Sequence, residues 1–128
     1  MSMSADLRDR LAASGLPGKV FRDEATQGTP LPRTILLVVS DPRPSTYEGR
    51  QQVRETRVQI DIQAASRGQA DAMAEQAIAA VEAGGTFGTT KFQRAFVDSA
   101  RTYSDRQAAT GTTFVTSLDL MVWHAPAA

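Results

Sequence analysis

The chain has 128 residues, with fourteen basic and fourteen acidic side chains and no cysteine. A chain of this length fits one domain spanning residues 1–128, and it can bury roughly two thirds of its unfolded surface. The balanced charge provides no overall field to attract DNA or an anionic membrane, and the lack of cysteine excludes disulfides and thiolate chemistry. The N-terminus is polar and no apolar run has the length of a membrane span, so we expect a soluble protein made in a cytoplasm.

The first part of the chain predicts a short helix and two strands. Residues Ser4 to Ala13 are expected to form a short packing helix. Ser4 can cap it, Leu7 and Leu11 lie on one side, and glycine and proline follow it. Lys19 to Arg22 is expected to form a short edge strand. Thr34 to Val39 is a continuous apolar, mostly β-branched run, which is typical of a strand covered on both faces.

The segment from Ser40 to Gln52, here called the arm, interrupts the strand pattern. Pro42 and Pro44 cannot take part in a central ladder, so the arm is expected to project as a hairpin or a long loop.

A long strand and an amphipathic helix follow the arm and organise the rest of the chain. From residue 56 to residue 64 every second side chain belongs to a core face, namely Thr56, Val58, Ile60, Ile62 and Ala64. Ser66 is a helix cap, and apolar residues then recur at helical spacing up to Val81. Gly84 and Gly85 are expected to provide a left-handed turn at the end of this helix.

The C-terminal part predicts two more strands. Lys91 to Val97 is expected to place Phe92, Arg94 and Phe96 on one face, and Thr112 to Trp123 is expected to be the last long strand. Ser99 to Gly111 is interpreted as a polar loop, and His124 to Ala128 as a loose tail. The predicted fold is α+β: a mostly antiparallel sheet of about four strands packed against one main amphipathic helix, with a short N-terminal helix and the projecting arm.

The sequence contains no recognisable catalytic constellation or cofactor motif. His124, the only histidine, is interpreted as an exposed terminal residue because no orienting partner is visible. Gly84 to Lys91 superficially resembles a phosphate loop, but it follows a helix instead of opening one, so a helix-ending turn is predicted. Asp98 and Asp105 match no metal-loop spacing. We therefore expect no enzyme, no cofactor and no metal.

Polar residues around the arm are better suited to a subunit contact than to phosphate binding. Arg50, Arg54 and Arg57 lie among acidic residues, and Arg54 and Arg57 fall on opposite faces of a strand. Tyr47, near the tip of the arm, is the candidate for an aromatic interface anchor, with a plain exposed tyrosine as the alternative.

The order and pattern of these segments resemble the tail-terminator or tail-completion proteins of long-tailed phages, prophages and gene transfer agents. The resemblance rests on Leu31 to Val38, the arm, Val58 to Ser66 leading into Ala70 to Ala74, and a late strand ending in Val122 and Trp123. Arg33 departs from the pattern, where such proteins favour an aromatic residue.

The resemblance implies a structural virion component at the head-proximal end of the tail, assembled in the bacterial cytoplasm. Such proteins form rings, expected to be hexameric, that cap the tail tube and join it to the head connector, and DNA only passes through. The implied partners are other copies of the chain, the tube protein and the connector or stopper protein. The candidate interface residues are Asp41, Arg43, Tyr47, Glu48, Arg50, Arg54, Arg57, Gln59 and Asp61.

Two alternatives come from other classes of protein. A small dimeric α+β module would bind an apolar ligand in a closed pocket. A small enzyme would need a deep pocket with perturbed carboxylates, for which Asp98, Asp105 and Asp119 are the candidates.

Overall fold

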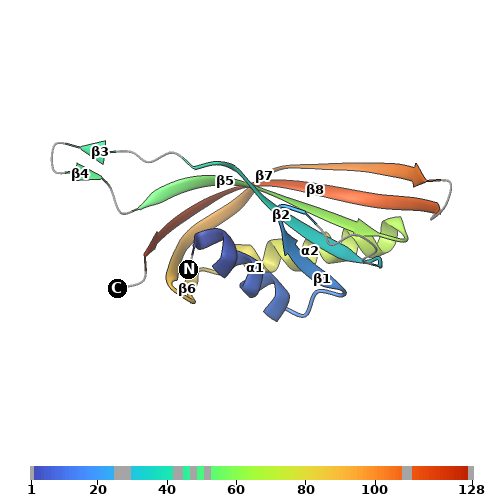
Figure 1. Cartoon of the computed structure of the whole chain (residues 1–128), viewed down its shortest axis with the longest axis horizontal. Coiled ribbons are helices and arrows are strands. Elements are labelled where there is room, and N and C mark those ends of the chain that lie inside the picture. The colour runs from blue at the N-terminus through green and yellow to red at the C-terminus, as the bar shows by residue number, and fades with distance from the viewer. Residues whose placement is uncertain are drawn as a thin grey trace.

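The computed structural model describes residues 2–24, 30–41, 45–46, 49–50, 53–107 and 111–126, with only the backbone of residues 45–46, 49–50 and 107. It shows an α+β fold in which a six-stranded sheet carries two helices on one face (Figure 1). The elements are α1 (Met3–Ala13), β1 (Lys19–Arg22), β2 (Arg33–Ser40), β3 (Ser45–Thr46), β4 (Gly49–Arg50), β5 (Arg54–Ala64), α2 (Arg67–Glu82), β6 (Gly85–Phe87), β7 (Thr90–Gln107) and β8 (Gly111–Pro126).

The strand order in the sheet is β1-β2-β5-β8-β7-β6. Only the β1–β2 pair is parallel, and every other neighbouring pair of the sheet is antiparallel. The prediction of a mostly antiparallel sheet is therefore confirmed, but its size of about four strands is wrong. The three-residue β6 was not predicted because so short a strand carries no alternation of its own.

The core lies between the sheet and the helices, as predicted from the alternation in β5. Thr56, Val58, Ile60, Ile62 and Ala64 are completely buried. From β8, the side chains of Leu118, Leu120 and Val122 join the same core, and α2 contributes Ala70, Met73, Ala74, Ala77 and Val81. Ser66 caps α2 as expected, because its side chain accepts a hydrogen bond from the backbone N–H of Gln69.

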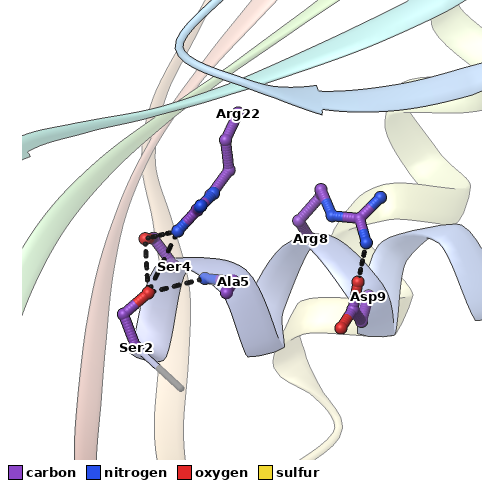
Figure 2. A network of polar contacts seen from close by, with 6 residues as sticks. All are labelled: Ser2, Ser4, Ala5, Arg8, Asp9 and Arg22. Atoms are coloured by element: carbon purple, nitrogen blue, oxygen red, sulfur yellow. Dashed lines mark hydrogen bonds and ion pairs between the residues drawn. The ribbon is translucent and has the colours of Figure 1, made fainter.

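Helix α1 is capped by Ser2, whereas the sequence suggested Ser4. The Ser2 Oγ accepts from the backbone N–H of Ala5 at 3.2 Å (Figure 2). Arg22 of β1 donates to the hydroxyls of Ser2 and Ser4 at 3.1 and 3.2 Å, which ties the start of the helix to the strand. Leu7 and Leu11 are buried, as the predicted apolar stripe requires.

The segment from Gly84 to Lys91 is a strand and a turn, so its interpretation as a helix-ending turn was wrong. Helix α2 ends at Glu82, and Ala83 is already extended. The next residues form β6 and a turn into β7 that packs on α1. The buried carboxylate of Asp6 accepts bonds there from the Thr89 N–H (3.2 Å), the Thr89 hydroxyl (3.0 Å) and the Thr90 hydroxyl (2.6 Å).

Strand β7 extends far beyond its predicted end. Residues from Ser99 to Gln107, predicted as loop, continue β7 and pair with β8 from Asp119 back to Gly111. The polar composition is explained by exposure, because the described side chains from Asp98 to Arg106 are all exposed and have no core face to fill. The register shift between Phe92 and Arg94 also puts Arg94 and Phe96 on the face opposite Phe92, contrary to the prediction.

Strand β2 is only partly covered. Thr34 and Leu36 are buried, but Val38 and Val39 are exposed by 41 and 53%. The prediction of a strand covered on both faces was therefore wrong at its C-terminal end, where β1 no longer runs beside it.

Candidate interaction surface at the arm and the open sheet face

The arm contains a short hairpin. Strands β3 and β4 are antiparallel, with Ser45 opposite Arg50 and Thr46 opposite Gly49. Figure 1 shows this hairpin projecting from the sheet at the end opposite the one where β7 ends and β8 begins. Of the predicted interface residues, Arg43, Tyr47 and Glu48 lie outside the described residues, and only the backbone of Arg50 is described.

A buried polar network lies at the root of the arm. Asp41, the second residue of the arm, accepts a bond from the Thr56 hydroxyl at 2.9 Å and faces Arg54 at 3.4 Å (Oδ2 to Nη1). The Thr56 Oγ1 also lies 2.6 Å from Nε2 of His124. The two ends of the arm are thus joined to each other and to the last strand.

His124 is a buried member of β8, so its interpretation as an exposed residue of a loose tail was wrong. Its exposed fraction is 2%, and it pairs with Arg54 of β5 and Phe92 of β7. The sequence held a signal for this position, because the inward alternation of Leu120 and Val122 continues to His124. The strand itself extends to Pro126.

Burial lowers the pKa of His124, the Arg54 charge lowers that pKa further, and Asp41 partly opposes both effects. The imidazole is therefore neutral at neutral pH. The Thr56 hydroxyl hydrogen points to Asp41, so the hydroxyl oxygen accepts from Nε2–H of His124. This assignment places the ring proton on Nε2.

The network does not have the geometry of a nucleophilic triad. In such a triad the histidine lies between the hydroxyl and the acid, whereas here the hydroxyl lies between Asp41 and His124. Thr56 is also completely buried and cannot reach a substrate. Its role in this arrangement is to hold the root of the arm in place.

A pocket of about 180 Å³ adjoins this network. Its lining combines polar side chains, including Asp41, Arg54 and Thr90, with apolar ones, including Met3 and Val38. It is smaller than the range of about 300–1,000 Å³ that is usual for small-molecule sites. It also differs in character from the closed apolar cavity that the ligand-binding alternative requires. None of Asp98, Asp105 and Asp119 lines it.

Three of the predicted interface residues share the sheet face that carries no helix. On β5, the Arg57 Nη1 donates to Asp98 at 3.2 Å, and the Gln59 Nε2 donates to Asp61 at 3.0 Å. Asp61 also accepts from the Ser117 hydroxyl at 2.7 Å. Arg54 lies on the helix side, in phase with the buried Thr56, which confirms that Arg54 and Arg57 face opposite sides.

The same face carries an aromatic cluster. The rings of Phe96 and Trp123 lie 5.2 Å apart, and the Arg94 guanidinium lies 5.7 Å from the Phe96 ring centre. Met121 stands between Phe96 and Arg57 in the ladder. The predicted face of Phe96 was wrong because the bulge that reverses it cannot be recognised from the alternation of the sequence.

These residues define the open face: Arg57, Gln59, Asp61, Phe96, Met121 and Trp123. Apolar side chains beside hydrogen-bonded polar ones, on a sheet side without helices, are characteristic of a protein contact surface. Within the described part of the chain, no group of three or more histidine, aspartate or glutamate residues could hold a metal ion. None of the described helices is long and apolar enough to cross a membrane.

The structure is thus that of a small α+β domain with one sheet face left open by the helices (Figure 1). The chain belongs to the family described as tail completion protein gp17, whose pattern matches residues 3–125. It is a structural component of a phage-type virion tail. A family of structural tail proteins gives no support to the enzyme alternative.

The fold is similar to that of a chain in the solved structure "Virion of native gene transfer agent (GTA) particle". The sequence identity is 16%, the TM-score is 0.58, and the match covers 97% of this chain and 96% of the other. No curated protein matches the chain.

Proposed function

We propose that this protein forms a closed ring at the head-proximal end of the tail, where it caps the tube and joins it to the head connector. The observation that carries the proposal is the placement of two separate contact elements, the projecting hairpin and the open face, on one small domain. Contacts between two different surfaces of identical subunits generate rings when the rotation closes. The partners are further copies of the chain, expected to number about six, together with the tube protein and the connector protein.

The buried network at the arm's root supports this proposal. A loop that contacts no other molecule has no need of a fixed direction. Here the two ends of the arm are joined through the fully buried Thr56 and the buried His124. Such a network sets the direction in which the hairpin leaves the sheet, and a contact element benefits from that preorganisation. The candidate contact residues remain Asp41, Arg43, Tyr47, Glu48, Arg50 and Arg54 at the arm and Arg57, Gln59 and Asp61 on the open face.

DNA has only a passive role in this proposal. The net charge of zero means that the ring neutralises few phosphates, so passing DNA is not retained.

The test removes the tip of the arm, residues 43–49, and replaces it with a short glycine-serine link. The solution mass of the purified protein, with and without tail tubes, reports ring formation, and thermal unfolding reports the monomer fold. We expect the fold to survive and both ring formation and head joining to be lost. Unchanged assembly of the shortened protein would contradict a role for the arm.

A point substitution tests the open face separately. Phe96→Arg places a charge on a side chain that is already 36% exposed, so the monomer tolerates it. Ala79→Arg, at an exposed position of α2 on the other side of the sheet, is the matched control. Loss of assembly in the first variant alone is the expected result. A stable dimer of the unaltered protein that never enlarges on tubes would instead favour the binding-module alternative.

A further inference from the structure

The outer length of β7 is an unpaired sheet edge. Strand β6 covers β7 only at Thr90 to Phe92, and beyond that point the described strands place β8 on one side of β7 and nothing on the other. A free edge presents a row of backbone N–H and C=O groups that a further extended chain can pair with.

The outer part of this edge has a regular backbone that is suited to pairing. Residues 93–107 contain neither proline nor lysine. The two register shifts lie before Ser99, so the stretch from Ser99 to Gln107 pairs with β8 residue for residue and is regular. Bulges and prolines, two devices that usually blunt an edge, are therefore absent from this stretch, and its charged side chains, Arg101, Asp105 and Arg106, carry both signs.

The Arg67 side chain of α2 also fixes the position of this stretch relative to β8. Arg67 of α2 donates to the carbonyl oxygens of Tyr103 (2.8 Å) and Val115 (3.1 Å) and to the Thr116 hydroxyl (3.2 Å). Its guanidinium lies 5.5 Å from the Phe114 ring centre. The free edge is therefore a preorganised strand.

We propose that the β7 edge pairs with β1 of a neighbouring copy, so that the sheet continues from one subunit to the next. This inference rests on the proposed ring and names the strands that close it. Strand β1 is the opposite edge of the same sheet. It runs parallel to β2, and β2, β5, β8 and β7 alternate in direction, so β1 and β7 run in opposite directions. A neighbour placed by rotation about an axis along the strands thus meets β7 in the antiparallel sense, which gives the stronger ladder.

The ladder across the sheet also sets the expected register. Lys19 is level with Arg33, Gln63, Val115 and Tyr103 in successive strands. Without displacement along the strands, Lys19 of one copy faces Tyr103 of the next. It then lies diagonal to Asp105, an opposite charge, on one side and to Arg101, a like charge, on the other, so a stagger toward Asp105 is the more favourable one.

A contact between two different edges cannot be completed by two copies alone. Each subunit offers one β1 and one β7, so pairing continues until the rotation closes, as a ring requires. This property separates the proposal from a twofold contact in which β7 meets β7.

Disulfide trapping tests the contact, and the natural absence of cysteine gives a clean background. The two variants are Lys19→Cys and Tyr103→Cys, both at exposed positions. Four strand spacings of about 4.8 Å separate these positions within one chain, which is too far for an internal bridge. Arg101→Cys and Asp105→Cys extend the scan by two residues in each direction to allow for stagger between the copies.

Oxidation of assembled protein that carries both cysteines should give a ladder of covalent oligomers that stops at the ring size. A mixture of the two single variants should give only dimers, and either variant alone should remain monomeric on a denaturing gel. Lys19→Cys combined with Ala79→Cys is the control pair and should give no ladder.

Two results would overturn the inference and leave the ring standing. One is self-linkage of Tyr103→Cys alone, which would show a β7–β7 contact. The other is a ring seen by imaging that no scanned pair can link. If the unaltered protein never forms rings, alone or on tail tubes, the proposed function itself is wrong, and that result is recognised before any cysteine is introduced.

Discussion

The imidazole of His124 lies 2.6 Å from the hydroxyl of Thr56, although the two residues are separated by 68 positions in the chain. The same hydroxyl donates to Asp41. One buried hydroxyl therefore connects the start of the arm, the strand after it and the last strand of the sheet.

Thr56→Val should destabilise the protein by about 1–3 kcal/mol, because it keeps the side-chain shape and leaves buried groups of His124 and Asp41 without their shared partner. Thr86→Val, at an exposed position of β6, is the control and should change the free energy of unfolding by less than about 0.5 kcal/mol. Urea unfolding measures both variants. Equal effects of the two substitutions would show that the network contributes nothing to stability.

Stability should also fall as the pH drops below about 6.5, the ordinary histidine pKa. The pKa of His124 is lowered in the folded protein, chiefly by burial and then by Arg54, with Asp41 opposing. Below pH 6.5 the unfolded chain therefore takes up a proton that the folded chain does not. The free energy of unfolding then falls by up to about 1.4 kcal/mol per pH unit until the pH reaches the pKa of His124 in the folded protein.

Urea unfolding of the unaltered protein and of His124→Gln between pH 5 and 8 measures this dependence. The glutamine variant is less stable at pH 8 but should lose less stability toward pH 5. Parallel curves for the two proteins would contradict a lowered histidine pKa.

Gly88→Ala should destabilise the protein strongly. Gly88 has a positive φ of 63°, and a Cβ atom there would lie 2.3 Å from Oδ1 of Asp6. Gly68→Ala is the matched control, since a Cβ at that exposed helical position meets nothing within 4 Å, and it should stabilise the protein by up to about 1 kcal/mol.

Gly88→Ala has two expected costs, the overlap with the Asp6 carboxylate and the backbone strain of a positive φ. A double-mutant cycle with Asp6→Ala separates them. Asp6→Ala alone is costly because three bonds to Thr89 and Thr90 are lost. In its background Gly88→Ala should cost less, because only the backbone strain is left. Strictly additive losses would show that the carboxylate does not restrict this turn.

Arg67→Met should loosen the outer halves of β7 and β8 and leave β5 intact. Methionine retains a flexible apolar side chain near Phe114 but removes the donors to Tyr103, Val115 and Thr116. Hydrogen exchange should accelerate between Ser99 and Arg106 and stay slow in β5. Arg8→Met, which removes a partly exposed ion pair with Asp9, is the control and should leave both regions unchanged.

The sequence predicted the centre of the fold well and its margins poorly. In β5 and α2, burial on one face forces the alternation and the helical stripe, so Thr56 to Ala64 and the Ser66 cap were identified correctly. Beyond Val97, β7 is exposed and polar, so its residues carry no strand pattern. Its extension depends on pairing with β8, which a local pattern cannot report.

The candidate surface was predicted in the same uneven way. Arg57, Gln59 and Asp61 share a face because strand periodicity fixes it. The network of Asp41, Thr56 and His124 was missed because each residue resembles an ordinary polar residue until the strands are aligned. Phe96 was missed because bulges change the face that a residue occupies without changing the sequence pattern.

The carboxylate of Asp6 has a consequence for how the molecule is made. Its partners Thr89 and Thr90 lie 83 and 84 positions later in the chain. Helix α1 packs chiefly on the early strands β1 and β2, but the three bonds to Asp6 can form only after β6 and the start of β7 have been made. Such distant contacts slow folding and leave apolar surface of the nascent chain uncovered. The bonds of Asp6 are therefore among the later contacts to form, and chaperone demand should be greatest before β8 emerges and completes the core.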